Sequence, residues 1–89
     1  MINKLDNADV IMISGKGHYG YIKTLDSDDA GIEVCYLAVC KYPKDNVIYL
    51  FLCDKNMSTE QDVDFESVEE AVTDAQRRSQ SQINWIYPD

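Results

Sequence analysis

The sequence predicts an α+β fold, in which an antiparallel sheet of three or four strands carries one C-terminal helix on one face. The clearest evidence is a central hairpin over residues 32–53, where two segments rich in Val, Ile, Leu and Tyr flank the turn-forming run Pro43–Asn46. The second observation is a helical pattern over about residues 67–80, which begins at a capping motif. With 89 residues, the chain has the length of a single compact domain, residues 1–89.

The segment before the hairpin predicts one or two further strands. Val10–Ile13 is an apolar run of strand length, and Tyr21–Leu25 is suitable for a second short strand. Between them, Gly15–Gly20 matches the G-x-G-x-x-G pattern of dinucleotide-binding sites, but that pattern needs a helix directly after it. The strand-like sequel and the acidic loop Asp26–Gly31 leave no room for such a helix, so we expect a glycine-rich turn.

The register of the hairpin follows from its loop, because a four-residue turn places Tyr42 opposite Val47. In this register one face collects only aliphatic side chains, which are Leu37, Val39, Ile48, Leu50 and Leu52. The other face collects aromatic and small side chains, which are Tyr36, Ala38, Cys40, Tyr42, Tyr49, Phe51 and Cys53. A shift of one residue would mix the two sets. Because both faces are largely apolar, either the sheet is covered on two sides or one side is a binding surface.

The helix is expected to cover the aliphatic face of the hairpin. Ser67 and Glu70 form a capping box, in which the Ser67 hydroxyl accepts from the Glu70 amide. Acidic residues fill the first turn and Arg77 and Arg78 the last, which complements the helix dipole. A narrow stripe allows close packing on the sheet and consists of Val68, Ala71, Val72, Ala75 and Ser79. After the helix, Trp85 is expected to pack at the sheet edge or the helix end.

The charge of the chain is the main evidence on function. It has 16 Asp and Glu residues against 8 Lys and Arg, which gives a formal net charge of −8 at pH 7. The acidic residues gather in Asp26–Glu33, in Glu60–Asp64 and on the exposed face of the predicted helix. A field of this sign repels phosphates and speeds association with cationic surfaces. The charge therefore favours a basic protein partner over direct binding of nucleic acid, and the alternative is a charged surface that serves only solubility.

No cofactor and no metal is expected. Cys35 and Cys40 are five residues apart on one predicted strand, so their side chains would lie on opposite faces and could not share a zinc ion. The acidic stretch 26–37 fits a calcium-binding loop only in part, because Ala30 and Leu37 occupy two ligand positions. Three cysteines without framework spacing are typical of free thiols in a reducing cytoplasm.

No set of residues has the spacing of a catalytic site. His18 is the only histidine, and nothing in the sequence places a cysteine beside it or singles out a pair of carboxylates for acid–base chemistry. No apolar stretch is long enough to span a bilayer, and no export signal opens the sequence. We therefore expect a cytoplasmic protein that is not an enzyme and does not bind membranes.

The order of hairpin, acidic turn and capped helix resembles that of the small immunity proteins of bacterial toxin systems. The resemblance covers roughly residues 32–79 and rests on pattern and acidity in Tyr36–Tyr42, Ile48–Asp54 and Phe65–Ala71. Such proteins are encoded beside contact-dependent or other polymorphic toxins. The resemblance implies a cytoplasmic inhibitor that docks on a toxin domain, commonly a nuclease, and occludes its active site. A nuclease that grips phosphate presents a basic cleft, which suits an acidic inhibitor.

The residues expected to contact such a partner fall into two groups. The electrostatic contacts are Asp26, Asp28, Asp29, Glu33, Glu60, Asp62 and Asp64. The aromatic anchors, if the aromatic face is partly exposed rather than ordinary core, are Tyr36, Tyr42 and Tyr49. Two other functions remain open: a nucleic-acid mimic that blocks a host defence nuclease, and a structural domain that self-associates through the aromatic face. The immunity protein is expected to be a monomer or a weak dimer.

Overall fold

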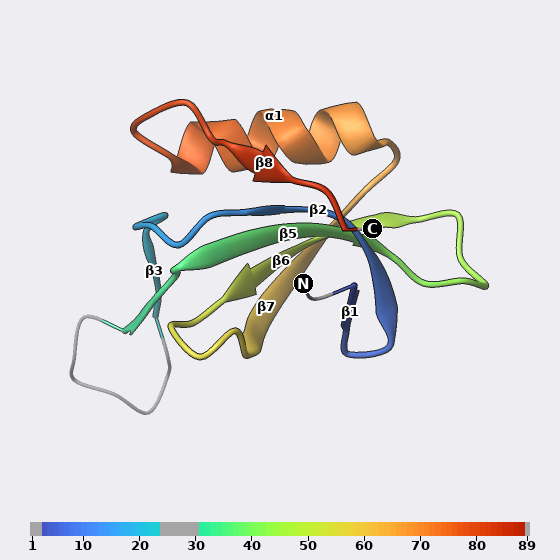
Figure 1. The fold of residues 1–89 in the computed structure, drawn as a ribbon, viewed down its shortest axis with the longest axis horizontal. Coiled ribbons are helices and arrows are strands. Elements are labelled where there is room, and N and C mark those ends of the chain that lie inside the picture. The colour runs from blue at the N-terminus through green and yellow to red at the C-terminus, as the bar shows by residue number, and fades with distance from the viewer. Residues whose placement is uncertain (1–2, 24–30, 89) are drawn as a thin grey trace.

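A curled antiparallel sheet with one helix lying across one face makes up the fold (Figure 1). The computed structural model describes residues 3–23 and 31–88. Its strands are β1 (Lys4–Leu5), β2 (Ala8–Ser14), β3 (Tyr21–Ile22), β4 (Ile32–Glu33), β5 (Tyr36–Lys41), β6 (Ile48–Cys53), β7 (Thr59–Phe65) and β8 (Trp85–Ile86). The main sheet has the order β1-β2-β5-β6-β7, with β8 also paired to β2, and β3 pairs with β4 in a separate small sheet. The helix α1 spans Val68–Arg78.

The register predicted for the central hairpin is confirmed. β5 and β6 pair from Tyr36 opposite Cys53 to Lys41 opposite Ile48, without a shift. The aliphatic face therefore forms one continuous surface, which lies under α1, and Leu37 and Leu50 on this surface are fully buried. Because the hairpin is apolar on this side, burial of its aliphatic face against the helix is the main driving force for this packing.

The helix packs on the aliphatic face as its small-residue stripe predicts. Ala71 and Ala75 are fully buried against the sheet, and their small side chains allow the helix backbone to approach it closely. The Ser67 hydroxyl accepts from the Glu70 amide at 3.2 Å, which confirms the cap, and the helix ends two residues earlier than expected, at Arg78. The helix is thus fixed at its start by a local hydrogen bond and along its length by packing.

The predicted number of strands is too low, since the described residues contain eight. β1, β3, β4 and β8 have two residues each, which is too short for a periodic pattern in the sequence. β7 is longer, but it is an edge strand in which only Val63 and Phe65 pack against the core. The predicted strand over 32–42 is also interrupted, because the chain leaves the small sheet after Glu33 and enters the main sheet at Tyr36.

A β-bulge in β2 explains why the run Val10–Ile13 does not alternate. The pairing with β5 shifts between Val10 and Met12, so Ile11 is an extra residue on β2. As a result Ile11 and Met12 both pack on the helix side of the sheet, whereas Val10 and Ile13 pack on the other side. The bulge lets one short strand contribute to both sides of the fold.

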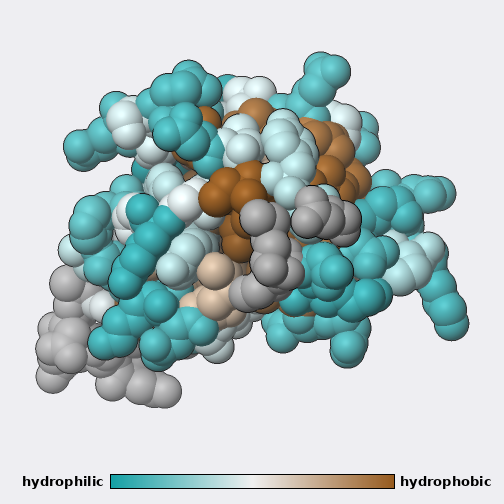
Figure 2. Space-filling model, viewed as in Figure 1, coloured by the Kyte–Doolittle hydropathy of each residue, from teal (hydrophilic) through white to brown (hydrophobic). Residues whose placement is uncertain are grey.

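The C-terminal tail returns along the main sheet and places Trp85 at its edge, as expected. Trp85 lies opposite Ser14 in the β8–β2 pair and packs partly against the core under the helix. Figure 2 shows hydrophobic residues in the middle of this view, with hydrophilic residues around them. Ile86 and Tyr87 in the tail are exposed. Over residues 3–23 and 31–88, no helix has the length and apolar character needed to cross a membrane.

Candidate functional site: an acidic tyrosine face

The side of the sheet opposite the helix has a buried centre and an open margin. Phe51 and Cys40 are fully buried there, and the N-terminal residues Leu5 and Val10 pack over them. The N-terminal strands therefore cover the centre of this face. The three tyrosines that the sequence places on this face, Tyr36, Tyr42 and Tyr49, are only half-buried.

Two of these tyrosines form an aromatic cluster with Phe51. The ring centroids of Tyr42 and Tyr49 are 5.4 Å apart and the rings are nearly perpendicular, which is the favoured edge-to-face arrangement. The Phe51 ring lies 6.4 Å from Tyr42 and 6.3 Å from Tyr49. The buried Phe51 thus supports two half-exposed phenol rings, whose positions are fixed by the sheet.

Four aspartates lie around this cluster. Two of them are on β7, and the other two are in turns. On β7, Asp64 lies opposite Tyr49 and Asp62 lies opposite Phe51, so both share the face of the aromatic rings. The turn between β5 and β6 contributes Asp45, whose carboxylate accepts from the Tyr49 hydroxyl at 3.5 Å. The fourth aspartate comes from the β1–β2 turn. We call this surface the acidic tyrosine face, defined by Tyr42, Tyr49, Phe51, Asp6, Asp45, Asp62 and Asp64.

The β1–β2 turn brings Asp6 to this face because of its backbone conformation. Asp6 and Asn7 have φ of 48° and 69°, and a two-residue hairpin turn of this type requires positive φ at both positions. Asp6 then lines an open hollow of about 210 Å³ together with Tyr42, Phe51 and Asp62, and Glu60 at the start of β7 lines the same hollow. The hollow therefore combines the aromatic rings of Tyr42 and Phe51 with carboxylates from the β1–β2 turn and from β7.

The electrostatics of this face are uncompensated. Partial burial raises the pKa of Tyr42 and of Tyr49, and the neighbouring aspartates raise both further. Ion pairs among the described residues join Lys4 to Asp9, His18 to Glu33 and Arg78 to Asp74, so none of them involves an aspartate of this face. The phenols stay protonated at neutral pH beside carboxylates that form no ion pair within residues 3–23 and 31–88, which is an arrangement suited to a bound cation.

The structure brings together only part of the predicted contact set. Asp62, Asp64, Tyr42 and Tyr49 form one surface, and Glu60 borders it. Tyr36 lies on the same side of the sheet but at the far end of β5, opposite Cys53. The remaining predicted acidic contacts lie elsewhere: Glu33 is in the small sheet, and Asp26, Asp28 and Asp29 fall outside the described residues.

Sequence reasoning missed Asp6 and Asp45, which both lie in turns. Asp6 is followed by Asn7, and an Asp-Asn pair between two short runs is a signal for a two-residue hairpin turn. Asp45 lies in the turn that was predicted, three residues after Tyr42. The turn signals were present in both cases, but the curl of the sheet that brings the two turns near the same rings is a property of the fold.

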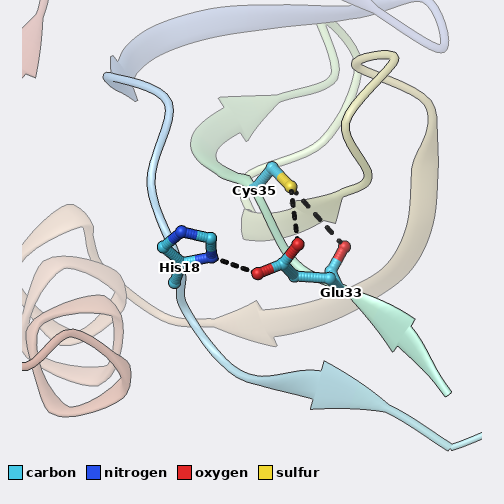
Figure 3. Close-up of polar contacts among 3 residues, drawn as sticks. All are labelled: His18, Glu33 and Cys35. Carbon is cyan, nitrogen blue, oxygen red and sulfur yellow. Dashed lines mark hydrogen bonds and ion pairs between the residues drawn. The ribbon is translucent and has the colours of Figure 1, made fainter. Parts of the chain in front are cut away.

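A second polar cluster joins His18, Glu33 and Cys35, as Figure 3 shows. The Glu33 carboxylate lies between the other two side chains, where it contacts the His18 ring and accepts from the Cys35 thiol at 3.8 Å. Burial and the nearby Glu33 raise the pKa of this thiol. A cysteine nucleophile needs a base in contact with it and a lowered pKa. The Glu33 carboxylate contacts the Cys35 thiol, but the pKa of this thiol is raised instead of lowered, so we interpret the cluster as a structural link between the glycine-rich loop and β4.

The other cysteines are also poor candidates for chemistry. Burial raises the pKa of Cys40 to about 12 and that of Cys53 to about 11, and all three cysteines are free thiols. Within residues 3–23 and 31–88, no group of three or more His, Cys, Asp or Glu side chains is arranged to hold a metal ion. These thiols are therefore small, buried packing residues on the tyrosine side of the sheet.

No protein-family model, no curated protein and no solved structure matches the chain. A function has to be inferred from the geometry and charge of the molecule itself. The acidic tyrosine face combines carboxylates, a cluster of aromatic rings and a hollow.

Proposed function

We propose that the chain is a non-enzymatic immunity protein, which binds the basic surface of a toxin domain through the acidic tyrosine face. The observation that carries this proposal is the group of four aspartates around half-buried Tyr42 and Tyr49, none of which forms an ion pair with a residue that the structure describes. The toxin domain of this proposal is a nuclease, and the inhibitor acts in the cytoplasm of the cell that makes the toxin.

The geometry suits this role for two physical reasons. A nuclease binds phosphates with Lys and Arg, and carboxylates spaced along a strand can occupy the same cleft in place of nucleic acid. Tyrosine rings lose little conformational entropy on binding and are frequent hot spots of protein interfaces. On this face the rings are already held by Phe51, so little ordering is needed when the partner binds.

The proposal is tested by co-expression with the toxin domain encoded next to this gene, in cells that the toxin alone stops from growing. Wild-type chain should restore growth, and Asp62→Lys should restore it poorly because a lysine would repel the basic surface. The matched control is Glu69→Lys, which changes the net charge by the same amount at an exposed position on α1, across the sheet from Asp62.

Three outcomes would contradict the proposal. These outcomes are the absence of a toxin gene beside this gene, failure of the wild-type chain to protect, and equal protection by the two variants. Protection against a host defence nuclease instead of a neighbouring toxin would identify the chain as a nucleic-acid mimic. A measurement of folding by circular dichroism on both variants makes sure that loss of protection reflects binding and not unfolding.

A further inference from the structure

The outer edge of β7 is an open strand edge beside the acidic tyrosine face. In the part of the chain that the structure describes, β7 ends the main sheet, and no strand pairs with its outer side (Figure 1). β7 has seven residues without proline, and most of its acidic and amide side chains are exposed. Such an edge can accept another strand, and proteins commonly place charged residues there to restrict which strand can pair.

Two hydrogen bonds establish which way the peptide groups of the sheet face. The Leu37 amide donates to the Ser14 hydroxyl on β2 at 2.9 Å, and the Cys35 amide donates to the Cys53 carbonyl at 2.8 Å. Successive peptide groups of a strand face alternate sides. The backbone of Leu37 therefore faces β2, and that of Cys53 faces β5.

The same alternation continues across β6 to β7. Because Cys53 faces β5, its neighbour Leu52 faces β7, where it lies opposite Gln61. On β7, the backbone N–H and C=O groups of Gln61 and Val63 therefore face β6. Those of Asp62 and Asp64 face outward, away from the sheet. Each of these two aspartates thus offers a free N–H and C=O at the edge and a carboxylate on the acidic tyrosine face.

We propose that the outer edge of β7 accepts an extended strand of the basic partner, with Lys or Arg side chains of that strand lying against Asp62 and Asp64. This inference rests on the proposed function, because it concerns the same partner. A second copy of this chain is a poor occupant, since antiparallel pairing of two β7 edges would set aspartates directly opposite one another. A strand with basic residues at alternate positions can form hydrogen bonds with the backbone of the edge and ion pairs with the carboxylates of Asp62 and Asp64.

The test uses the full chain and a cyclic β-hairpin peptide whose outer strand alternates Lys and Val. The matched control peptide has the same sequence with N-methyl groups on the outward amides of that strand, which keeps the charge and prevents backbone pairing. Amide hydrogen exchange measured by NMR should slow at Asp62 and Asp64 when the first peptide is added. The control peptide should bind more weakly and should leave the exchange at both positions unchanged.

Substitutions of one residue then separate charge from backbone pairing. Asp62→Asn removes only the carboxylate, so it should weaken the binding of the first peptide and reduce its salt dependence. Asp62→Pro also removes the outward N–H, which should weaken binding by a further factor of about 2–10, the value of one hydrogen bond. Proline at an outward-facing position of an edge strand costs no bond to β6, and Asp64→Pro provides a second variant of the same kind.

The outcomes distinguish this inference from the proposed function. If both peptides bind equally, Asp62→Asn weakens both, and no amide is protected, then strand pairing is wrong while the acidic face still binds basic partners. If neither peptide binds at low ionic strength, both the strand pairing and the acidic binding face are contradicted. Strand pairing is supported if the first peptide protects the amides of Asp62 and Asp64 and if Asp62→Pro weakens binding of this peptide more than Asp62→Asn does.

Discussion

The two sides of the main sheet are built from the same strands, yet they have different covers and different chemistry. On the helix side, β5 and β6 present aliphatic residues that α1 buries completely, with Leu37 and Leu50 as examples. On the other side, the same two strands present Tyr42 and Tyr49, which stay half-exposed among aspartates. The helix side is thus buried over the whole hairpin, whereas the other side is buried only at its centre and has an open margin.

The largest expected effect is on stability and contrasts two neighbours in β6. Leu50→Ala should lower the free energy of unfolding by about 2–5 kcal/mol, because it leaves a cavity in a fully buried site. Tyr49→Ala should lower it by only about 1–2 kcal/mol, since the ring is half-exposed. Urea unfolding of the two variants checks this order. Equal losses would mean that the tyrosine side contributes to stability as much as the helix side.

The second prediction concerns binding, where the tyrosine side is expected to matter most. Tyr42→Ala should weaken the complex with the basic partner by about 2 kcal/mol, which is the scale of an interface hot spot. Tyr42→Phe is the matched control, because it keeps the ring and its contact with Tyr49. Isothermal titration calorimetry with the toxin domain measures both variants. A Tyr42→Ala variant that binds as tightly as wild type would remove this face from the interface.

A smaller effect on stability is expected at the start of the helix. Ser67→Ala removes the hydroxyl that accepts from the Glu70 amide, and should lower the free energy of unfolding by about 1 kcal/mol. Ser67→Asp, which keeps a capping oxygen, should restore most of this loss. Thermal unfolding followed by circular dichroism provides the measurement. Partner binding should be unchanged in both variants, because α1 lies across the sheet from the acidic tyrosine face.

The smallest effect is a pH dependence of the tyrosines. In the folded chain the pKa of Tyr42 and Tyr49 lies above the ordinary value of 10.0, with burial as the largest cause. The folded state therefore keeps phenol protons that the unfolded state has lost, and stability should fall as the pH rises through 10.0 and beyond. Ultraviolet titration of phenolate should show tyrosines that ionise above their ordinary pKa. Asp45→Asn should shift the pKa of one of them toward the ordinary value. Unshifted titration in both would contradict the electrostatics described for this face.

The sequence was sufficient to predict the hairpin and the helix, for physical reasons that can be named. A register shifted by one residue would mix the aliphatic and aromatic residues of β5 and β6. A capping serine before a small-residue stripe specifies where α1 begins and which way it faces. β7 was missed because an edge strand needs apolar residues on one side only, and β7 carries just Val63 and Phe65 there. Short strands such as β1 form because their neighbours pair with them, which no local pattern records.

The site was predicted less completely than the fold. Asp62 and Asp64 were found as part of an acidic run, and their alternation on β7 places them beside the rings that the hairpin register had put on one face. Asp6 joins them only because the sheet curls and the β1–β2 turn folds over its concave side. Glu33 was predicted as a contact because it belongs to the acidic run Asp26–Glu33, but the structure places it in β4 of the small sheet, away from this surface.

The central claim is that the acidic tyrosine face is the surface that meets a basic partner. The most direct measurement is the association rate constant of the chain with the toxin domain at low and at physiological ionic strength, for wild type, Asp62→Lys and Glu69→Lys. The account predicts that Asp62→Lys slows association roughly tenfold at low ionic strength and less at physiological ionic strength, while Glu69→Lys has a much smaller effect. Equal slowing by the two variants would show that only the net charge of the chain matters, and would contradict the assignment of this face.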